Sequence, residues 1–369
     1  MWWLILPVLI YSAGLLVLWL ILVHRNRISV PRGKRFPKVS VIVAVRNGEK
    51  RIRYLLESLA RQDYPSDLLE IIIVNDNSTD RTPIVVSEFI TALTDRPDLC
   101  IKFIYNPFSG KKRAVRYGIE KASGEVIITT DADCIVGPEW VRSHASWYAG
   151  DGPEMVLAPV VQKAARGFWS HFGVFEFSAL QAITEATAVA GHPVMCNAAN
   201  MSFRRDVYLR HADDLRPDLP SGDDMFLLAA VMGDGGAVRH DGSGSAAAET
   251  AAAVTAAALL RQRARWASKA FQLRSVPTLT LAAATAACNA AVAAAAVASF
   301  ISLKFIPLAA AMYAIKTVPD YLMISTEMRK RGTKIHAGMF LLSEIVYPFY
   351  FVLVGVMSRL PGAGRFRER

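Results

Sequence analysis

The chain has 369 residues, of which 53% are hydrophobic, and its formal net charge is +10 at pH 7. This length allows one large domain or two of ordinary size, so the size of the hydrophobic core is not limiting. The four cysteines are widely spaced, which argues against a metal site or a disulfide framework and indicates reduced structural thiols in a cytosol-facing domain. They are Cys100, Cys134, Cys196 and Cys288.

The first 24 residues are apolar enough, and long enough, to cross a bilayer as a helix. Basic residues follow this stretch rather than precede it, which is the reverse of the order in a cleaved signal peptide. We therefore expect an uncleaved anchor over residues 1–24 in a bacterial inner membrane, with the next domain in the cytoplasm. The basic run fits juxtamembrane charge better than a nucleic-acid interface, and it comprises Arg25, Arg27, Arg32, Lys34, Arg35 and Lys38.

Apolar, β-branched runs alternate with helical patterns from residue 38 onward. The runs predict strands over Val39–Val45, Leu69–Val74, Ile101–Tyr105 and Val126–Thr130, and polar residues follow each of them. This alternation predicts an α/β fold with a mostly parallel, doubly wound sheet. Neither a Gly-x-Gly-x-x-Gly sequence after the first strand nor a Walker A sequence is present, which argues against a standard dinucleotide or P-loop site.

Two acids separated by one residue, Asp131 and Asp133, end the strand over Val126–Thr130. Carboxylates at this edge of a parallel sheet can hold a hard divalent cation, leaving its other positions for phosphate oxygens of a ligand. A surface turn is the alternative, because aspartate is common where strands stop. Lys111 and its neighbours Lys112 and Arg113 follow the third strand and can meet phosphates.

Five segments in order resemble the membrane-bound family 2 glycosyltransferases, the group that contains cellulose, chitin and hyaluronan synthases and ceramide glucosyltransferases. The order of the segments is far more specific than any one of them. The resemblance covers roughly residues 38 to 270. Its motifs are Val41–Asn47, Val74–Asp80, Asp131-Ala132-Asp133, Ser221-Gly222-Asp223-Asp224 and Gln262-Arg263-Ala264-Arg265-Trp266.

The resemblance implies a GT-A fold and a nucleotide-diphosphate sugar donor. It places Asp76 at the nucleoside with Asn47 beside it, and Lys111 near the base or diphosphate. Asp131 would support the nucleotide, and Asp133 would bind the diphosphate through Mg²⁺ or Mn²⁺.

On the acceptor side, the resemblance implies that Asp224 is the general base. Gln262, Arg265 and Trp266 would lie at the site, with Trp266 beneath the acceptor sugar and Arg265 near the leaving diphosphate. The segment Cys196–Met201 is similar to the family stretch before the base, although the family usually has glycine at the position of Ala198. One base without a covalent nucleophile implies inversion at the anomeric carbon.

Simpler structural interpretations remain for each motif. Asp223 and Asp224 can cap a helix, and the arginines around Trp266 can belong to an interfacial amphipathic helix. The seven histidines have no ligand-like spacing. An aromatic stretch over Phe168–Phe177 can line an acceptor groove, lie at a membrane interface or pack in the core.

The last third of the chain is rich in alanine and then strongly apolar. Residues 242–260 have high helix propensity but offer little side chain for a binding surface. Two or three membrane segments are expected over residues 276–358. Glu344 lies inside one of these apolar stretches, so we expect it to face protein or a polar cavity rather than lipid.

We therefore predict an anchor over residues 1–24, a GT-A domain over 38–240, an alanine-rich and Gln-x-x-Arg-Trp interfacial segment over 241–275, and membrane segments over 276–358. The predicted function is inverting transfer of a sugar, most simply from a UDP-sugar, to a lipid or growing glycan at the membrane. The alternatives are a non-catalytic nucleotide-sugar sensor or scaffold and, with less support, a nucleotidyltransferase. Single addition to a lipid and processive polysaccharide synthesis both remain open.

Overall fold

A computed structural model describes residues 2–24, 36–94, 97–216, 219, 222–270 and 275–360. The basic run over residues 25–35, Ser221 and the arginines at positions 365, 367 and 369 lie outside these residues. The chain divides into two compact units. We call them the sheet unit, Arg27–Val161 with Met195–Ala251, and the helical unit, Met1–Asn26 with Gln162–Val194 and Ala252–Arg369.

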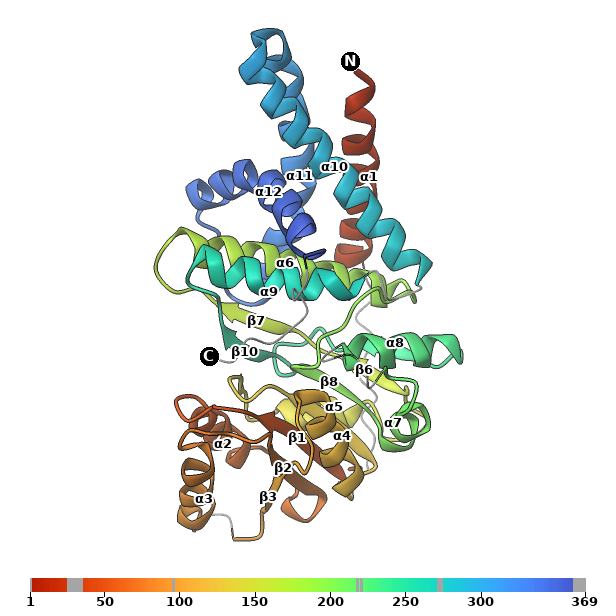
Figure 1. Ribbon diagram of the computed structural model, residues 1–369. Helices are drawn as coiled ribbons and strands as arrows, with labels where there is room; N and C mark the ends of the chain where they lie inside the picture. Colours follow the sequence, from red (N-terminus) through yellow and green to blue (C-terminus); the bar gives the residue numbers. More distant parts are fainter. Residues whose placement is uncertain are drawn as a thin grey trace. The chain divides into compact units, whose positions relative to one another are not determined.

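The sheet unit contains a seven-stranded, mostly parallel sheet in the order β3-β2-β1-β4-β8-β6-β9, as the alternating pattern predicts (Figure 1). The strands β1, β2, β3 and β4 run parallel, whereas β8 runs antiparallel to both β4 and β6. Their bounds are β1 Val39–Val45, β2 Leu69–Asn75, β3 Cys100–Tyr105, β4 Val126–Thr130, β6 Met155–Leu157, β8 Asn200–Arg204 and β9 Val238–His240.

Helices cover both faces of this sheet because its central strands bury side chains on both sides. Val41 and Val43 of β1 share a core with apolar residues of α2, α3 and α5. The intervening residue Ile42 faces α4, where a Cβ atom added to Gly118 would lie 2.8 Å from Ile42 Cγ2. The helices are α2 Ile52–Ala60, α3 Thr82–Ala92, α4 Lys111–Lys121, α5 Trp140–Ser146, α7 Arg205–His211 and α8 Asp223–Gly233, with a 3-10 turn η2 Ser66–Leu68.

Part of the alanine-rich segment is a strand rather than a helix. The strand β10, Ala248–Ala251, belongs to a three-stranded sheet in the order β5-β10-β7, with β5 Ile135–Val136 and β7 Val160–Lys163. Ala248 pairs with Val136 and donates its backbone N–H to the carbonyl of Pro159 at 3.0 Å. Strand pairing therefore overrides the intrinsic helix propensity of alanine here.

The helical unit is built from long helices, three of which are long and apolar enough to cross a membrane: Trp3–His24, Val276–Ile301 and Ala337–Met357 (Figure 1). The predicted N-terminal apolar helix is thus present, and two of the described C-terminal helices meet the same criterion. The elements are η1 Trp2–Ile5, α1 Leu6–His24, α6 Phe168–Val189, α9 Ala256–Ala270, α10 Val276–Ile301, η3 Leu303–Phe305, α11 Ile306–Lys330 and α12 Ala337–Met357.

Small side chains let the helices of this unit approach closely. Ala291 and Ala295 of α10 pack with Val8 of α1 and Met312 of α11, and Ala182 of α6 packs with neighbours on α1 and α11. Alanine at a helix contact lowers the distance between backbones and so increases van der Waals contact. Close helix packing therefore explains the alanines of α10. It does not explain the alanine-rich run that contains the strand β10.

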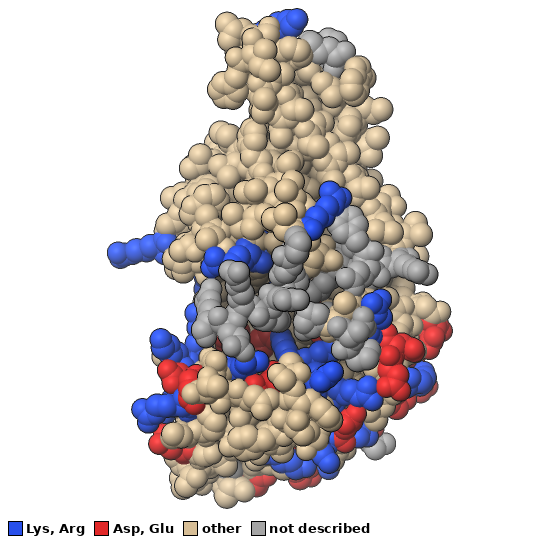
Figure 2. All heavy atoms as spheres, in the orientation of Figure 1, with Lys and Arg blue, Asp and Glu red and all other residues tan. Residues whose placement is uncertain are grey.

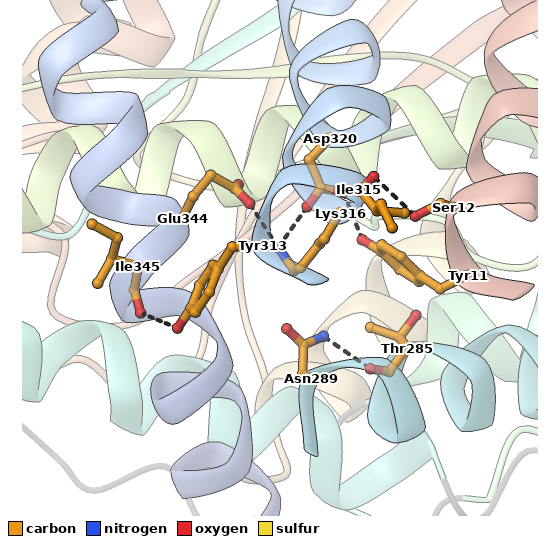
Figure 3. Close-up of polar contacts among 10 residues, drawn as sticks. All are labelled: Tyr11, Ser12, Thr285, Asn289, Tyr313, Ile315, Lys316, Asp320, Glu344 and Ile345. Atoms are coloured by element: carbon orange, nitrogen blue, oxygen red, sulfur yellow. Dashed lines mark hydrogen bonds and ion pairs between the residues drawn. The ribbon is translucent and has the colours of Figure 1, made fainter. Parts of the chain in front are cut away.

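A charged cluster is buried among the helices α1, α11 and α12 (Figure 3). Lys316, 1% exposed, donates to Oδ2 of Asp320 at 2.6 Å and to Oε2 of Glu344 at 2.7 Å. Oδ1 of Asp320 accepts a further hydrogen bond from the Tyr11 hydroxyl at 2.7 Å. The expectation that Glu344 faces protein is therefore confirmed, and Lys316 and Asp320 lie within the continuous helix α11.

The described surfaces of the two units differ in charge on the face drawn in Figure 2. Basic and acidic side chains lie interspersed over the sheet unit, whereas the helical unit presents mainly uncharged residues. Phe300, Ile301 and Leu303, at the turn between α10 and α11, are 91%, 83% and 77% exposed. Such exposed apolar side chains are typical of a lipid-facing or otherwise covered surface.

Candidate active site

The loops that follow β1 and β2 are joined through Asn47. This residue has φ of 52°, a left-handed conformation that asparagine adopts more readily than most residues. Its backbone N–H donates to Oγ of Ser78 at 3.0 Å, and its Oδ1 accepts a hydrogen bond from the backbone N–H of Thr79 at 2.8 Å. Asn47 therefore shapes the carboxyl edge of the sheet where the sequence predicts the donor.

Asp76 lies directly after β2 and is buried, with 3% of its surface exposed. Its Oδ1 accepts hydrogen bonds from Nδ2 of Asn106 at 2.8 Å and from the backbone N–H of Gly110 at 2.9 Å. Gly110 has φ of 112°, which favours glycine, and it immediately precedes α4. Asp76 thus fixes the loop that delivers Lys111, and its contact with a nucleoside stays a prediction.

Lys111, the first residue of α4, meets the first acid of the Asp-x-Asp motif. Its Nζ lies 2.5 Å from Oδ1 of Asp131, and each side chain is about one-third exposed. Desolvation opposes the positive charge, but the carboxylate of Asp131 raises the pKa of Lys111 above its usual range. Asp223 and Asp224, at the start of α8, raise it further, so three acids act electrostatically on this one lysine.

Asp133, the second acid of the motif, lies 3.3 Å from Nη1 of Arg51, which precedes α2. Desolvation and then the negative charge of Asp131 raise the pKa of the Asp133 carboxyl group. A nearby positive charge stabilises the ionised form of such a carboxyl group. Arg51 supplies one here, and sequence reasoning did not single it out.

The donor set fits a divalent cation only if the ligand contributes to its coordination. Among the described residues no three His, Cys, Asp or Glu side chains are grouped as in an all-protein metal site. Mg²⁺ is commonly held by one or two carboxylates together with substrate phosphates and water. Asp133, with Asp131 beside it, suits that arrangement, and the ion pair with Arg51 would be exchanged when a cation binds.

The predicted base, Asp224, lies in the first turn of α8, with Gly222 as the N-cap residue. Its Oδ1 accepts the backbone N–H of Met225 at 2.9 Å, and its Oδ2 accepts that of Ala198 at 3.1 Å. The aspartates therefore do not cap the helix from the N-cap position. Instead, backbone donors hold the Asp224 carboxylate in one orientation.

The segment that begins at Cys196 supports this base. Besides the donor from Ala198, the backbone N–H of Cys196 lies 3.3 Å from Sδ of Met225, and burial raises the pKa of the Cys196 thiol well above its usual value. The φ of Ala198 is not positive, so this position does not require glycine. The departure from the family pattern is thus accommodated by the backbone.

The Gln-x-x-Arg-Trp residues lie on α9, in the helical unit, and the acids described above lie in the sheet unit. Oε1 of Gln262 accepts a hydrogen bond from Nη1 of Arg263 at 2.7 Å. The Trp266 ring lies 4.2 Å from the guanidinium carbon of Arg263. Gln262, Arg265 and Trp266 are all partly exposed. Their predicted roles at the acceptor stay predictions.

Residues 40–211 match the family model described as glycosyl transferase family 2. This range includes Asn47, Asp76, Lys111, Asp131 and Asp133. The probable glycosyltransferase YdaM of Bacillus subtilis is 42% identical over 100 residues, which are 27% of this chain and 24% of that protein. Beta-monoglucosyldiacylglycerol synthase of a Synechocystis species is 29% identical over 138 residues, which are 37% of this chain and 28% of that protein. The matched segments thus span about a quarter of the length of these curated relatives.

A solved structure agrees over a longer range. Mannosyltransferase PcManGT from Pyrobaculum calidifontis, in complex with GDP-Man and Mn²⁺, is similar with a TM-score of 0.63. The similarity covers 94% of this chain and 99% of that chain at 21% identity, which establishes a shared fold. The chain therefore has an α/β fold of the GT-A type, and its residues 40–211 are similar to glycosyl transferase family 2.

Proposed function

We propose that the protein transfers a sugar from a nucleotide-diphosphate sugar to a lipid or growing glycan at a membrane, with inversion at the anomeric carbon. The observation that carries this proposal is the arrangement around Lys111. One cation is paired with Asp131 at 2.5 Å and is also under the electrostatic influence of Asp223 and Asp224. The Asp-x-Asp loop and the predicted base therefore share one electrostatic environment.

The chemistry requires charge of both signs in this arrangement. Departure of a nucleoside diphosphate leaves negative charge, which a divalent cation held by Asp133 would neutralise. Lys111 and Arg51 present further positive charge beside the two acids of the motif. On the other side of the sugar, Asp224 accepts the proton of the acceptor hydroxyl, and no covalent intermediate is needed.

The helical unit supports a location in a membrane and an acceptor at its surface. Three helices long and apolar enough to span a membrane support an integral membrane protein, and the basic residues after the first helix favour a cytoplasmic domain. The relative named beta-monoglucosyldiacylglycerol synthase supports a lipid acceptor, and single addition is the simpler expectation for this chain. A UDP-sugar is the first donor to test. GDP-sugars belong in the same panel because a structural relative was solved with GDP-Man.

The test measures release of nucleoside diphosphate by the purified full chain in detergent or nanodiscs. A panel of UDP- and GDP-sugars is offered with Mn²⁺ or Mg²⁺ and with membrane lipid or glycan acceptors. Release from one donor, dependent on the metal, supports the proposal. We expect Asp224→Asn to lower the rate by about 100-fold or more, as for loss of a general base. Asp213→Asn, an exposed change on the same unit, is the matched control.

Two results separate the alternatives. Inversion is tested by the anomeric configuration of the product, and product length distinguishes single addition from processive synthesis. If every donor binds but none turns over in the presence of these acceptors, the catalytic proposal fails. A non-catalytic nucleotide-sugar sensor or scaffold then accounts for the chain better.

A further inference from the structure

Arg263, the second residue of the Gln-Arg-Ala-Arg-Trp motif on α9, is buried, with 4% of its surface exposed. Its Nη1 donates to Oε1 of Gln262 at 2.7 Å. Its guanidinium carbon lies 4.2 Å from the centre of the Trp266 ring, close enough for a cation–π contact. The guanidinium of Arg263 therefore contacts both Gln262 and Trp266, two residues that the resemblance places on the acceptor side.

The charge of Arg263 is balanced by Glu176 on α6, which has 9% of its side chain exposed. Nε of Arg263 donates to Oε2 of Glu176 at 2.9 Å. The hydroxyl of Tyr350, on α12, donates to the same carboxylate at 3.3 Å to Oε2 and 3.4 Å to Oε1. The apolar residues Phe172 and Leu259 pack against Tyr350 and close this site. All of these residues belong to the helical unit.

The geometry differs from that of an arginine that only neutralises an acid. Such an arginine commonly pairs side-on, with two parallel N–H bonds to the two carboxylate oxygens. Here Nε alone contacts Glu176, and Nη2 is buried without a hydrogen-bond partner among the described residues. Leaving a donor unsatisfied is costly. Within the described part of the chain, Nη2 therefore stays unpaired in an arrangement in which Nη1 contacts Gln262 and the face of the guanidinium contacts Trp266.

We propose that Glu176 is a positioning residue for the glycosyl transfer, acting through Arg263 to fix the side chains of Gln262 and Trp266. This inference rests on the proposed function, because it assigns Gln262 and Trp266 to the acceptor. Glu176 lies 86 positions before Gln262 in the chain and belongs to none of the five motifs. Tyr350 adds a second hydrogen bond that keeps the carboxylate facing Arg263.

The competing explanation is a purely structural ion pair. Removing one partner of a buried pair leaves an uncompensated charge and destabilises the fold, whatever the role of the pair. Removing both partners with side chains of similar volume commonly restores stability. A double variant, Glu176→Gln with Arg263→Met, therefore separates the two explanations, because it removes the charge problem and also removes the support of Gln262 and Trp266.

The experiment uses the full chain in nanodiscs and measures steady-state transfer, donor binding and apparent melting temperature. For Glu176→Gln we expect the kcat/KM for the acceptor to fall by about 10- to 100-fold, a typical cost of misplaced reacting groups, while the Kd of the donor changes less than about twofold. Glu176→Asp keeps the carboxylate and should retain most of the activity. The double variant should recover its melting temperature but not its acceptor kcat/KM.

Glu185→Gln is the matched control on the same helix. Glu185, with 1% of its side chain exposed, pairs with Lys330, a residue outside the motif, at 3.1 Å. Its loss should lower the melting temperature without changing the acceptor kcat/KM at a temperature where the protein is folded. If the double variant recovers activity together with stability, or if Glu176→Gln affects activity no more than Glu185→Gln, the positioning role is wrong.

A second readout keeps this inference separate from the proposed function. The fluorescence difference between the parent and Trp266→Phe reports the surroundings of Trp266, and this difference should change when Glu176→Gln is introduced in both. If the parent transfers no sugar from any donor, the proposed function fails, and the fluorescence alone decides the local inference. An unchanged Trp266 signal would overturn it.

Discussion

Nζ of Lys111 lies 2.5 Å from Oδ1 of Asp131, so the first carboxylate of the Asp-x-Asp motif is neutralised from within the chain. The neighbouring Lys112 points elsewhere: its Nζ donates to the backbone carbonyls of Leu215 and Arg216, and the side chain is 8% exposed. The two adjacent lysines at the start of α4 therefore have different contacts. Lys111 lies at the candidate donor site, and Lys112 holds the neighbouring backbone.

Replacing Lys111 by methionine should weaken donor binding with little effect on stability. The change removes a charge-assisted contact worth about 1.5 to 3 kcal/mol, which corresponds to roughly 10- to 100-fold in Kd for the nucleoside diphosphate. Titration calorimetry with Mn²⁺ present measures this Kd. Lys121→Met, at the other end of α4, is the control. Equal affinities for the Lys111 variant and the parent would contradict a donor role.

Replacing Lys112 by methionine should produce the opposite pattern. The variant removes the charged donor to the carbonyl groups of Leu215 and Arg216, and it removes the contact with the Phe226 ring, whose centre lies 5.1 Å from Nζ. We expect the free energy of unfolding to fall by about 2 kcal/mol. The apparent melting temperature of the full chain measures the loss. A Lys112 variant that melts like the parent would mean that these contacts add no stability.

The sheet was the most predictable part of the structure. The runs Val39–Val45 and Val126–Thr130 are strands with the predicted bounds, because continuous β-branched residues ended by polar ones leave few alternatives. The insertion of antiparallel β8 beside β4 was not predictable, since Asn200–Arg204 has no such run. Ala248–Ala251 was harder still, because its strand depends on partners distant in the sequence.

The residue types of the candidate site were predicted from the sequence, whereas the contacts among them were not. Asp131 and Lys111 could each be placed at the edge of the sheet, yet their ion pair depends on where α4 begins relative to β4. No local sequence pattern marks Arg51 or the backbone N–H of Ala198. Each matters only through its contact, with Asp133 and with Asp224 respectively. The roles of the predicted site residues and the domain bounds remain predictions.

Stability should fall in mildly acidic solution because His144 is buried as a neutral imidazole. Its Nε2 donates to Oδ1 of Asn200 at 3.0 Å and its Nδ1 accepts from Oγ of Ser202 at 2.9 Å. Burial lowers the pKa of His144 below its usual range.

The sign follows from the proton count. Above about pH 6.5 both the folded and the unfolded state hold a neutral His144, so the residue causes no pH dependence. As the pH falls from there towards the folded-state pKa, only the unfolded state binds a proton. The free energy of unfolding then drops by about 1.4 kcal/mol per pH unit from this residue.

Melting curves between pH 7.5 and 5 should therefore separate two histidine variants. His144→Gln should melt with a weaker dependence on pH than the parent, because Gln cannot take up the proton. His192→Gln, at an exposed position, should follow the parent. Identical pH profiles for the parent and His144→Gln would show that His144 does not contribute to acid sensitivity.

The buried cluster of the helical unit should depend more on its lysine than on either acid (Figure 3). Lys316 pairs with both Asp320 and Glu344, so Lys316→Met leaves these two carboxylates together in an apolar surrounding without that cation. We expect a loss of about 3 to 5 kcal/mol, the usual cost of an unpaired buried charge. Glu344→Gln leaves a one-to-one pair of Lys316 and Asp320 and should cost much less.

Thermal unfolding of the full chain in one detergent ranks these variants against Lys304→Met, which removes an exposed lysine. We expect the highest melting temperature for Lys304→Met, a lower one for Glu344→Gln and the lowest for Lys316→Met. Adding Asp320→Asn and Glu344→Gln to Lys316→Met removes every charge and should restore part of the loss, because no group is then left ionised without a partner. If Lys316→Met has the same melting temperature as Lys304→Met, charge balance does not hold α1, α11 and α12 together. Their packing along the alanines of α10 would then account for the stability alone.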